Sequence, residues 1–200
     1  MFTHTRLMLD ALPPPGPERS LRLALGILFH DVGKPPTAEL TPRPDGTARW
    51  TFREHAAVGA EMTEAILRRL RAPNDVIADV TRLVRTHMRT GDAPKMRRSK
   101  LRSLVGDPLF ADMLALHKLD CAASNGLTDA AEFLDRVAAE FSSEPALPPP
   151  LIRGRDLIRL GYKPGPAMGA LLRELYERQL DENVTDPAVL LAGIQPPSVP

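Results

Sequence analysis

Six side chains of metal-ligand type recur along the sequence at the ends, or on the inner faces, of separate predicted helices. They are His4, His30, Asp31, His55, His87 and Asp120. Imidazole nitrogens and carboxylate oxygens are common ligands of divalent cations, whereas burying such groups without partners carries a large free-energy cost. Their convergence on the interior of a helical bundle predicts a metal site built from facing helices, and a set of independent core histidines is the less favoured interpretation.

The adjacent pair His30-Asp31 is the centre of this pattern. It follows an apolar run that begins at Leu25, and Gly33 then ends the run. An apolar helix that ends on imidazole and carboxylate groups needs something to bind them, and a divalent metal ion removes the cost of burying them. For an isolated pair, a hydrogen-bonded core histidine beside a capping aspartate would be the simpler interpretation. The other four ligand-type residues favour the metal.

The elements that must position these residues are helices. We expect Ser20 to cap an apolar helix that is buried at the centre of the domain and carries His30 at its C-terminal end. His55 begins another predicted helix, and apolar steps of three and four residues place His87 on the buried face of a helix over 74–88. Further helices are predicted over 2–12, 99–105, 107–125 and 128–141, with a loop over 91–98. The predicted fold class is therefore all-α.

The stretch from Lys34 to Phe52 is rich in proline and is predicted to be a loop. The step Asp45-Gly46 can close a small β-hairpin within this loop. Trp50 and Phe52 would then either cover the site or seal the core, and the residues leave these two interpretations equally open.

Prolines divide the chain into three predicted parts. Residues 1–141 form the metal-binding helical domain, 142–150 form a proline-rich linker of low helical potential, and 151–200 form a small C-terminal helical unit. Within the last unit, short helices are predicted over 156–160 and 167–180, and another begins at Pro187.

The composition is that of an ordinary globular protein, with 43% hydrophobic and 26% charged residues among 200. The net charge of +1 gives no global field that would attract nucleic acid or a membrane, so any basic surface must be local. The single cysteine, Cys121, is interpreted as a small core residue, and it excludes an internal disulfide and a multi-cysteine zinc site. We find neither a signal peptide nor an apolar run long enough to span a bilayer, and therefore expect a cytoplasmic protein.

The order of His4, the pair His30-Asp31 and Asp120 resembles the H…HD…D signature of the HD-domain metal-dependent phosphohydrolases. The two remaining histidines of the set resemble the extra ligands of the variant that holds two metal ions. The resemblance implies that the four signature residues hold one ion, and that Asp31 bridges to a second ion held by those two histidines. It also implies an HD-domain helical bundle with the C-terminal unit as an appendage.

Two divalent cations about 4 Å apart can activate water and clamp a phosphoryl group, so Asp31 is assigned a catalytic role as their shared ligand. Lys34 is assigned a catalytic and substrate-binding role, because an ammonium group can neutralise developing charge; a solvated loop lysine is the equal alternative. Nitrogen and oxygen ligands suit Mn, Fe, Co, Ni or Zn and do not choose among them. His117, one turn before Asp120, is interpreted as a core histidine rather than a partner that orients Asp120.

Three longer stretches resemble the C-terminal half of bacterial CCA-adding enzymes and poly(A) polymerases that carry an HD domain. They are Phe29-His-Asp-Val-Gly-Lys-Pro35, Phe52-Arg-Glu-His-Ala-Ala-Val-Gly-Ala60 and Asp156-Leu-Ile-Arg-Leu-Gly-Tyr-Lys-Pro-Gly-Pro166. The resemblance covers the chain from about His4 to Leu191. The nucleotidyltransferase head of that family should precede His4, and we find no Gly-Ser with a paired-carboxylate strand in its place. We therefore do not carry polymerase activity over to this sequence.

A local basic run extends from Lys95 to Arg102, and we expect it to lie beside the site and bind phosphate, although such runs are more often solvated faces. The predicted substrate-binding residues are Lys34, Arg89, Arg97 and Arg98. The family resemblance implies hydrolysis of 2′,3′-cyclic phosphates and 2′-phosphates, so the expected substrates are nucleotides or RNA ends. Two alternatives remain: a non-catalytic RNA-binding or docking module, and a split subunit that works with a separate nucleotidyltransferase head.

Overall fold

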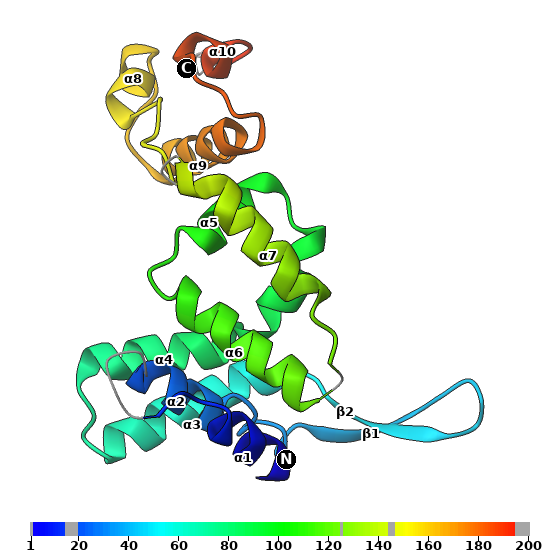
Figure 1. The fold of residues 1–200 in the computed structure, drawn as a ribbon. Coiled ribbons are helices and arrows are strands. Elements are labelled where there is room, and N and C mark those ends of the chain that lie inside the picture. The colour runs from blue at the N-terminus through cyan, green and yellow to red at the C-terminus, as the bar shows by residue number, and fades with distance from the viewer. Residues whose placement is uncertain (1, 15–19, 125, 144–146, 195–200) are drawn as a thin grey trace. The chain divides into compact units, whose positions relative to one another are not determined.

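The computed structural model describes residues 2–14, 20–124, 126–143 and 147–194, and these residues are mostly helical. In chain order the elements are α1 (Phe2–Asp10), α2 (Leu21–Phe29), β1 (Ala38–Pro42), β2 (Ala48–Phe52), α3 (His55–Arg69), α4 (Asn74–Thr86), the 3₁₀ segment η1 (His87–Lys95), α5 (Arg98–Val105), α6 (Phe110–Ala123), α7 (Asp129–Glu140), η2 (Phe141–Ser143), α8 (Gly154–Arg159), α9 (Pro166–Asp181) and α10 (Pro187–Leu191) (Figure 1). The predicted all-α class is confirmed, with the expected hairpin as the one sheet among the described residues.

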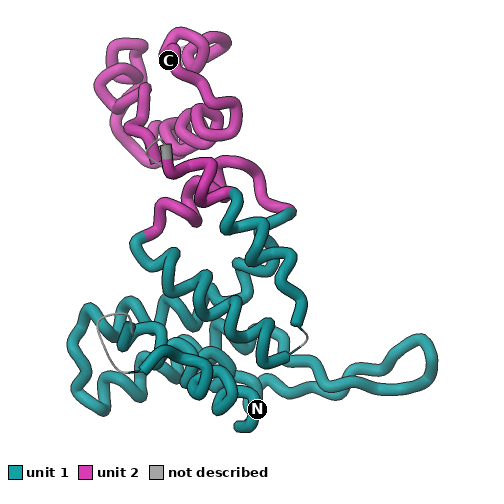
Figure 2. Tube along the Cα trace, viewed as in Figure 1, with its two compact units in different colours: residues 1–94, 108–136 teal, residues 95–107, 137–200 magenta. Residues whose placement is uncertain are grey.

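The chain forms two compact units (Figure 2). The first contains residues 1–94 and 108–136, and the second contains residues 95–107 and 137–200. The second unit thus includes α5, which packs against α9 although α5 ends at Val105 and α9 begins only at Pro166. The predicted borders at 141 and 150 follow the prolines instead, and whether they delimit separately folding domains stays a prediction.

Helix α2 is the central element of the first unit. The Ser20 hydroxyl accepts a hydrogen bond from the amide of Leu23 and so caps its N-terminus, as predicted. Ile27 is fully buried and Leu23 nearly so, within a cluster that α1 and α6 complete. Burying side chains of this size contributes about 1.5–3 kcal/mol each. The predicted burial of this apolar helix is incomplete, because Leu21 is 60% and Leu28 47% exposed.

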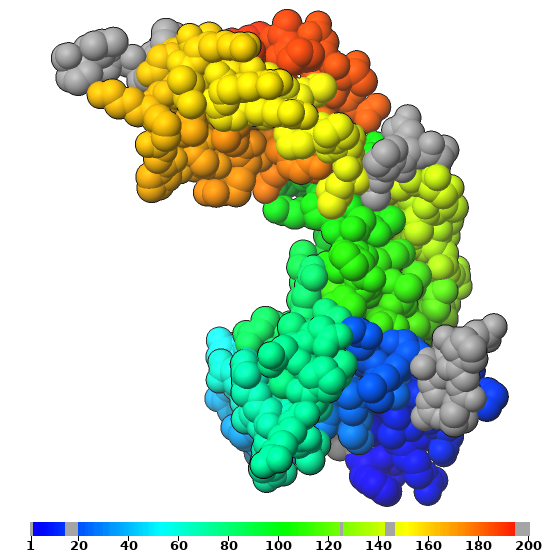
Figure 3. Space-filling view, turned by 90° about the vertical axis from the view of Figure 1, so that its left-hand side faces the viewer, coloured from blue at the N-terminus to red at the C-terminus, as the bar shows by residue number. Residues whose placement is uncertain are grey.

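Helices α3 and α4 pack against each other as an antiparallel pair, and α4 also covers one side of α2; their surfaces adjoin in the space-filling view (Figure 3). The buried positions of α4 recur every three to four residues, and His87 at its C-terminus continues this buried face. Asn74 is the first residue of α4 rather than its cap, since Pro73 occupies the cap position. Leu70 caps the C-terminus of α3 and is 64% exposed.

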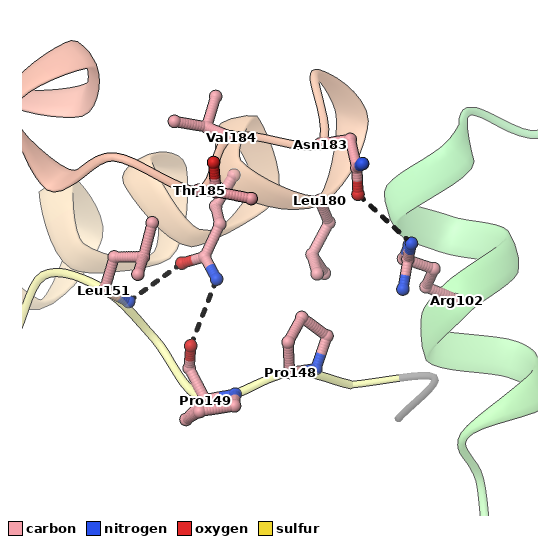
Figure 4. Close-up of a pocket in the computed structure, with 9 residues that line it drawn as sticks. Arg102, Pro148, Pro149, Leu151, Leu180, Asn183, Val184 and Thr185 are labelled. Carbon is pink, nitrogen blue, oxygen red and sulfur yellow. Dashed lines mark hydrogen bonds between the residues drawn. The ribbon is translucent and has the colours of Figure 1, made fainter. Parts of the chain in front are cut away.

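The second unit has its own small core, formed by α8, α9 and α10 around Leu157, Leu175 and Leu190. The buried Gln179 side chain fixes the preceding segment to α9, because it accepts from the Leu151 amide and donates to the Pro149 carbonyl. A cavity of about 190 Å³ lies between α9, this segment and α5 (Figure 4). Among the described residues, no helix is both long and apolar enough to cross a bilayer.

Candidate metal centre

Five elements of the first unit bring the six predicted ligands together. They are His4 from α1, His30 and Asp31 from the end of α2, His55 from the start of α3, His87 from the end of α4 and Asp120 from α6. Five of the six line a cavity of about 410 Å³. The sixth, His30, is buried against them, with its ring centroid 5.5 Å from those of His4 and of His87. Residues separated by up to 116 positions in sequence therefore share one site.

The ligand atoms form two overlapping groups. In one group the side chains of His4, His30 and Asp31 each offer an atom, and in the other those of Asp31, His55 and His87 do so, with all atoms of a group within 4.8 Å of one another. Asp31 belongs to both groups. A carboxylate has two oxygens, so one side chain of this kind can serve two neighbouring cations.

Three of the histidines make the same hydrogen bond with Nδ1 and therefore share one tautomer. The Nδ1 atoms of His30, His55 and His87 each lie 2.7–2.8 Å from the backbone carbonyl oxygen three residues earlier. A carbonyl oxygen can only accept, so each Nδ1 carries the ring proton and donates it. Each Nε2 in the neutral ring is consequently an unprotonated lone pair directed at the cavity, which is the arrangement of metal-binding histidines.

These lone pairs fit a bound cation better than they fit one another. Nε2 of His55 and Nε2 of His87 are only 3.2 Å apart, and Nε2 of His30 is buried without a hydrogen bond. Two facing lone pairs repel unless a cation lies with them. Retention of a proton by His87 is disfavoured, because burial lowers its pKa to about 4. The donor set of imidazole nitrogens and carboxylate oxygens therefore fits a divalent metal ion.

Asp31 is ionised and ready to act as a ligand. Burial raises its pKa, but the neighbouring His30 and Lys34 side chains outweigh this effect and hold the pKa well below its usual value. Lys34 Nζ lies 2.6 Å from Asp31 Oδ2, at the edge of the cavity. Lys34 thus lies beside the candidate site and is paired with Asp31.

His4 and Asp120 form the more accessible side of the cavity, with side chains 19% and 32% exposed. His4 Nε2 is 3.0 Å from Asp120 Oδ1, and its Nδ1 is 3.3 Å from the carbonyl oxygen of Ala123. The other histidines and Asp31 are almost fully buried by comparison.

The predicted substrate-binding arginines belong to different compact units. Arg89 is exposed on η1, two residues after His87, in the first unit. Arg97 and Arg98 belong to the second unit, where Arg97 pairs with Glu177 at 3.0 Å and Arg98 with Glu140 at 2.7 Å. Their contact with a phosphate stays a prediction.

Three residues that line the cavity were not assigned to the site from the sequence: Phe52, Met88 and Ser124. Phe52 was left between two interpretations, and the structure places it at the site. Met88 follows His87 in the 3₁₀ segment η1. This segment extends to Lys95 and so replaces the first part of the predicted loop over 91–98. Ser124 donates to the carbonyl of Asp120, a four-residue spacing that the sequence could have indicated.

The sequence profile of the HD domain family matches residues 1–122. The chain belongs to this family. HD domains are metal-dependent hydrolases that bind divalent cations, and the two groups of His and Asp side chains described above are of the kind that could hold them.

Two curated proteins resemble the chain beyond the HD domain. An A-adding tRNA nucleotidyltransferase of Deinococcus radiodurans is 34% identical over 205 residues, which cover 98% of this chain and 46% of that protein. A CC-adding tRNA nucleotidyltransferase of Thermus thermophilus is 38% identical over 171 residues, which cover 84% of this chain and 38% of that protein. The chain therefore spans less than half the length of either relative.

The region around Gly33 holds the two halves of the site together. A Cβ atom on Gly33 would overlap the carbonyl oxygen of His55 and lie 2.6 Å from the amide nitrogen of Gly59. The turn that follows Asp31 thus packs directly on the backbone of α3, which only glycine permits. This close approach sets the distance between Asp31 and His55, whose Oδ1 and Nε2 are 3.8 Å apart.

Gly33→Ala is expected to lower the free energy of unfolding of the metal-free chain by about 1–3 kcal/mol, because the clash is with backbone that cannot rotate away. Gly91→Ala is the matched control, since its Cβ would meet only His117 Cε1 at an ordinary 3.7 Å. Denaturant titration of both variants measures the difference. Equal stability of the two variants would show that the turn and α3 are not packed this closely.

Proposed function

We propose that this chain is a phosphohydrolase that acts on nucleotides or RNA ends, with 2′,3′-cyclic phosphates as the first candidates, through a site for two divalent metal ions. The observation that carries the proposal is the position of Asp31, which is common to both groups of potential ligands. A site for one ion does not need a second set of histidines whose Nε2 lone pairs face the same carboxylate.

Each residue of the site has a role in this proposal. His4, His30, Asp31 and Asp120 hold one ion, and Asp31 together with His55 and His87 holds the other. Divalent ions of this kind lower the pKa of coordinated water towards neutrality and stabilise negative charge on a phosphoryl group. The Lys34 ammonium, 2.6 Å from Asp31, lies where it can donate hydrogen bonds to phosphoryl oxygens and neutralise charge on them.

The direct experiment is a hydrolysis assay with adenosine 2′,3′-cyclic phosphate. The chain is loaded in turn with Mn, Fe, Co, Ni and Zn, and the monophosphate products are separated by chromatography. Loaded protein should turn over the substrate, and Lys34→Met should lower kcat by about 10²-fold with metal content unchanged, the cost of removing one charge-stabilising donor. Lys118→Met, which alters an exposed lysine paired with Asp135, is the control. Absence of turnover with every metal would rule out this activity.

Arg97 and Arg98 are kept as proposed phosphate contacts of the substrate. Their present ion pairs lie at the surface, where such pairs contribute no more than about 1 kcal/mol, so a phosphate can compete with the glutamates. Reversing both arginines to glutamate should raise KM for a nucleotide phosphodiester more than for bis-p-nitrophenyl phosphate. Equal changes for the two substrates would assign the arginines to the structure of the second unit alone.

A second candidate function is a docking or split-subunit role with a separate nucleotidyltransferase head. It is supported by the two relatives, both named as tRNA nucleotidyltransferases, of which the chain spans 46% and 38%. Mixing the chain with a nucleotidyltransferase head and tRNA lacking its 3′ end tests this role through the extension of the tRNA. Extension that persists in an Asp31→Asn variant would favour docking, because such a role does not need the metal ligands.

A further inference from the structure

The hairpin of β1 and β2 has one face made entirely of apolar side chains. Its register pairs Leu40 with Trp50, with Ala38 opposite Phe52 on one side and Pro42 opposite Ala48 on the other. Side chains alternate between the two faces of a strand, so these six residues share a face. The other face is polar and carries Glu39, Thr41, Arg49 and Thr51.

The apolar face is not covered by the rest of the first unit. Leu40 is 55% and Trp50 61% exposed, and in Figure 1 the hairpin extends away from the helices of this unit. Trp50 therefore neither covers the metal site nor seals the core, the two interpretations left open above. This apolar face is therefore accessible to a ligand.

The apolar face begins at the metal site. Phe52 lines the cavity that holds the ligands, and its ring centroid lies 5.7 Å from Lys34 Nζ. Trp50 is two residues earlier on the same strand and face, about 7 Å farther from the cavity. A molecule that places its phosphate in the cavity and carries a planar group several ångströms from that phosphate could therefore lay the planar group on this face.

We propose that the apolar face of the hairpin, and Trp50 above all, binds the base of the nucleotide whose phosphate occupies the metal cavity. Aromatic side chains form stacking platforms for any base, because every base has a π face. The inference rests on the proposed function for the class of substrate and adds a second contact to it. That contact selects nucleotides and RNA ends over sugar phosphates, which have no planar ring.

The size of the face argues against a second copy of the chain as the occupant. Strands of five residues span only about 17 Å and lie about 4.8 Å apart, and three of the six side chains are alanine or proline. A stable interface needs about 800 Å² from each partner, several times what this face can offer. A single base matches the area of the Trp50 indole.

Trp50 is the only tryptophan of the chain, so its fluorescence reports on this face alone. The full metal-loaded chain is titrated with 3′-AMP and with ribose 3-phosphate, which lacks the base. We expect 3′-AMP to quench the Trp50 emission and ribose 3-phosphate to leave it unchanged. Quenching that instead follows protein concentration, with association in sedimentation experiments, would overturn the proposal in favour of self-association.

Substitutions measure how much the platform contributes. In calorimetric titrations Trp50→Ala should weaken 3′-AMP binding about 5- to 150-fold, whereas Trp50→Phe should retain most of the affinity and ribose 3-phosphate should bind all variants equally. Leu70→Ala removes a similarly exposed apolar side chain elsewhere and should change nothing. Equal affinity of Trp50→Ala and the unmodified chain for 3′-AMP would overturn the proposal.

The two proposals fail in different ways. If 3′-AMP quenches Trp50 but no nucleotide is hydrolysed, the base platform stands and the hydrolase proposal falls. If nucleotides are hydrolysed and Trp50→Ala has unchanged KM values, the platform falls and the hydrolase proposal stands.

Discussion

Asp31→Ala is expected to empty the site of both metal ions, whereas His55→Ala is expected to retain one. The Asp31 carboxylate belongs to both groups of ligand atoms, while His55 belongs to one. The loss of hydrolytic rate in Asp31→Ala should therefore exceed the roughly 10²–10³-fold that removal of a single charge-stabilising donor costs. Metal content and phosphodiesterase rate are measured on the same preparations of both variants.

Asp45→Ala is the matched control for this comparison. Asp45 is also a loop aspartate, but it is exposed and bonds only within its own turn, to Thr47. The Asp45→Ala variant should therefore retain the full metal content. Retention of both ions by Asp31→Ala would contradict the shared-ligand assignment even if the activity were lost.

Metal loading is expected to raise the thermal midpoint of the chain by roughly 10 °C. A ligand that binds only the folded state at 1,000 times its dissociation constant stabilises that state by about 4 kcal/mol, and a chain of this size gains about 2–4 °C per kcal/mol. The physical source is the Nε2 of His30, which is buried without a hydrogen bond, together with the close approach of the His55 and His87 Nε2 atoms, which a cation between them would relieve. Calorimetry with and without chelator measures the shift.

This rise of the thermal midpoint on metal loading should disappear in Asp31→Ala. It should persist in Lys118→Met, which leaves every candidate ligand in place. The site lies wholly in the first unit, so a separate transition of the second unit should not move. A midpoint that is the same with metal and with chelator would mean that the cluster does not bind ions tightly when folded.

The parts of the fold that follow local rules could be predicted from the sequence. The Ser20 cap, the buried face of α4 and the hairpin around Asp45-Gly46 each depend on residues close together in the chain. The six candidate ligands could be singled out because buried His and Asp residues need partners wherever they occur. Their order along the chain then matched a known signature.

The features that the sequence could not predict depend on distant neighbours. Leu28 belongs to an apolar run, but the described part of the chain leaves its side chain 47% exposed. Phe52 ends a short strand whose other residues are mostly exposed, and its local sequence does not show that it lies at the cavity. In the sequence Arg97 and Arg98 appear as a basic run without acidic partners. Their glutamate partners lie far along the chain, at positions 177 and 140, so the ion pairs could not be foreseen.

The measurement that tests the central claim most directly is the metal stoichiometry of the unmodified chain. Protein prepared without chelators, then loaded with Mn or Zn and freed of excess ions by gel filtration, is subjected to elemental analysis. Six ligands on five elements, joined by a shared Asp31, predict two ions per chain. A chain that retains no ion under any of these conditions would contradict the account.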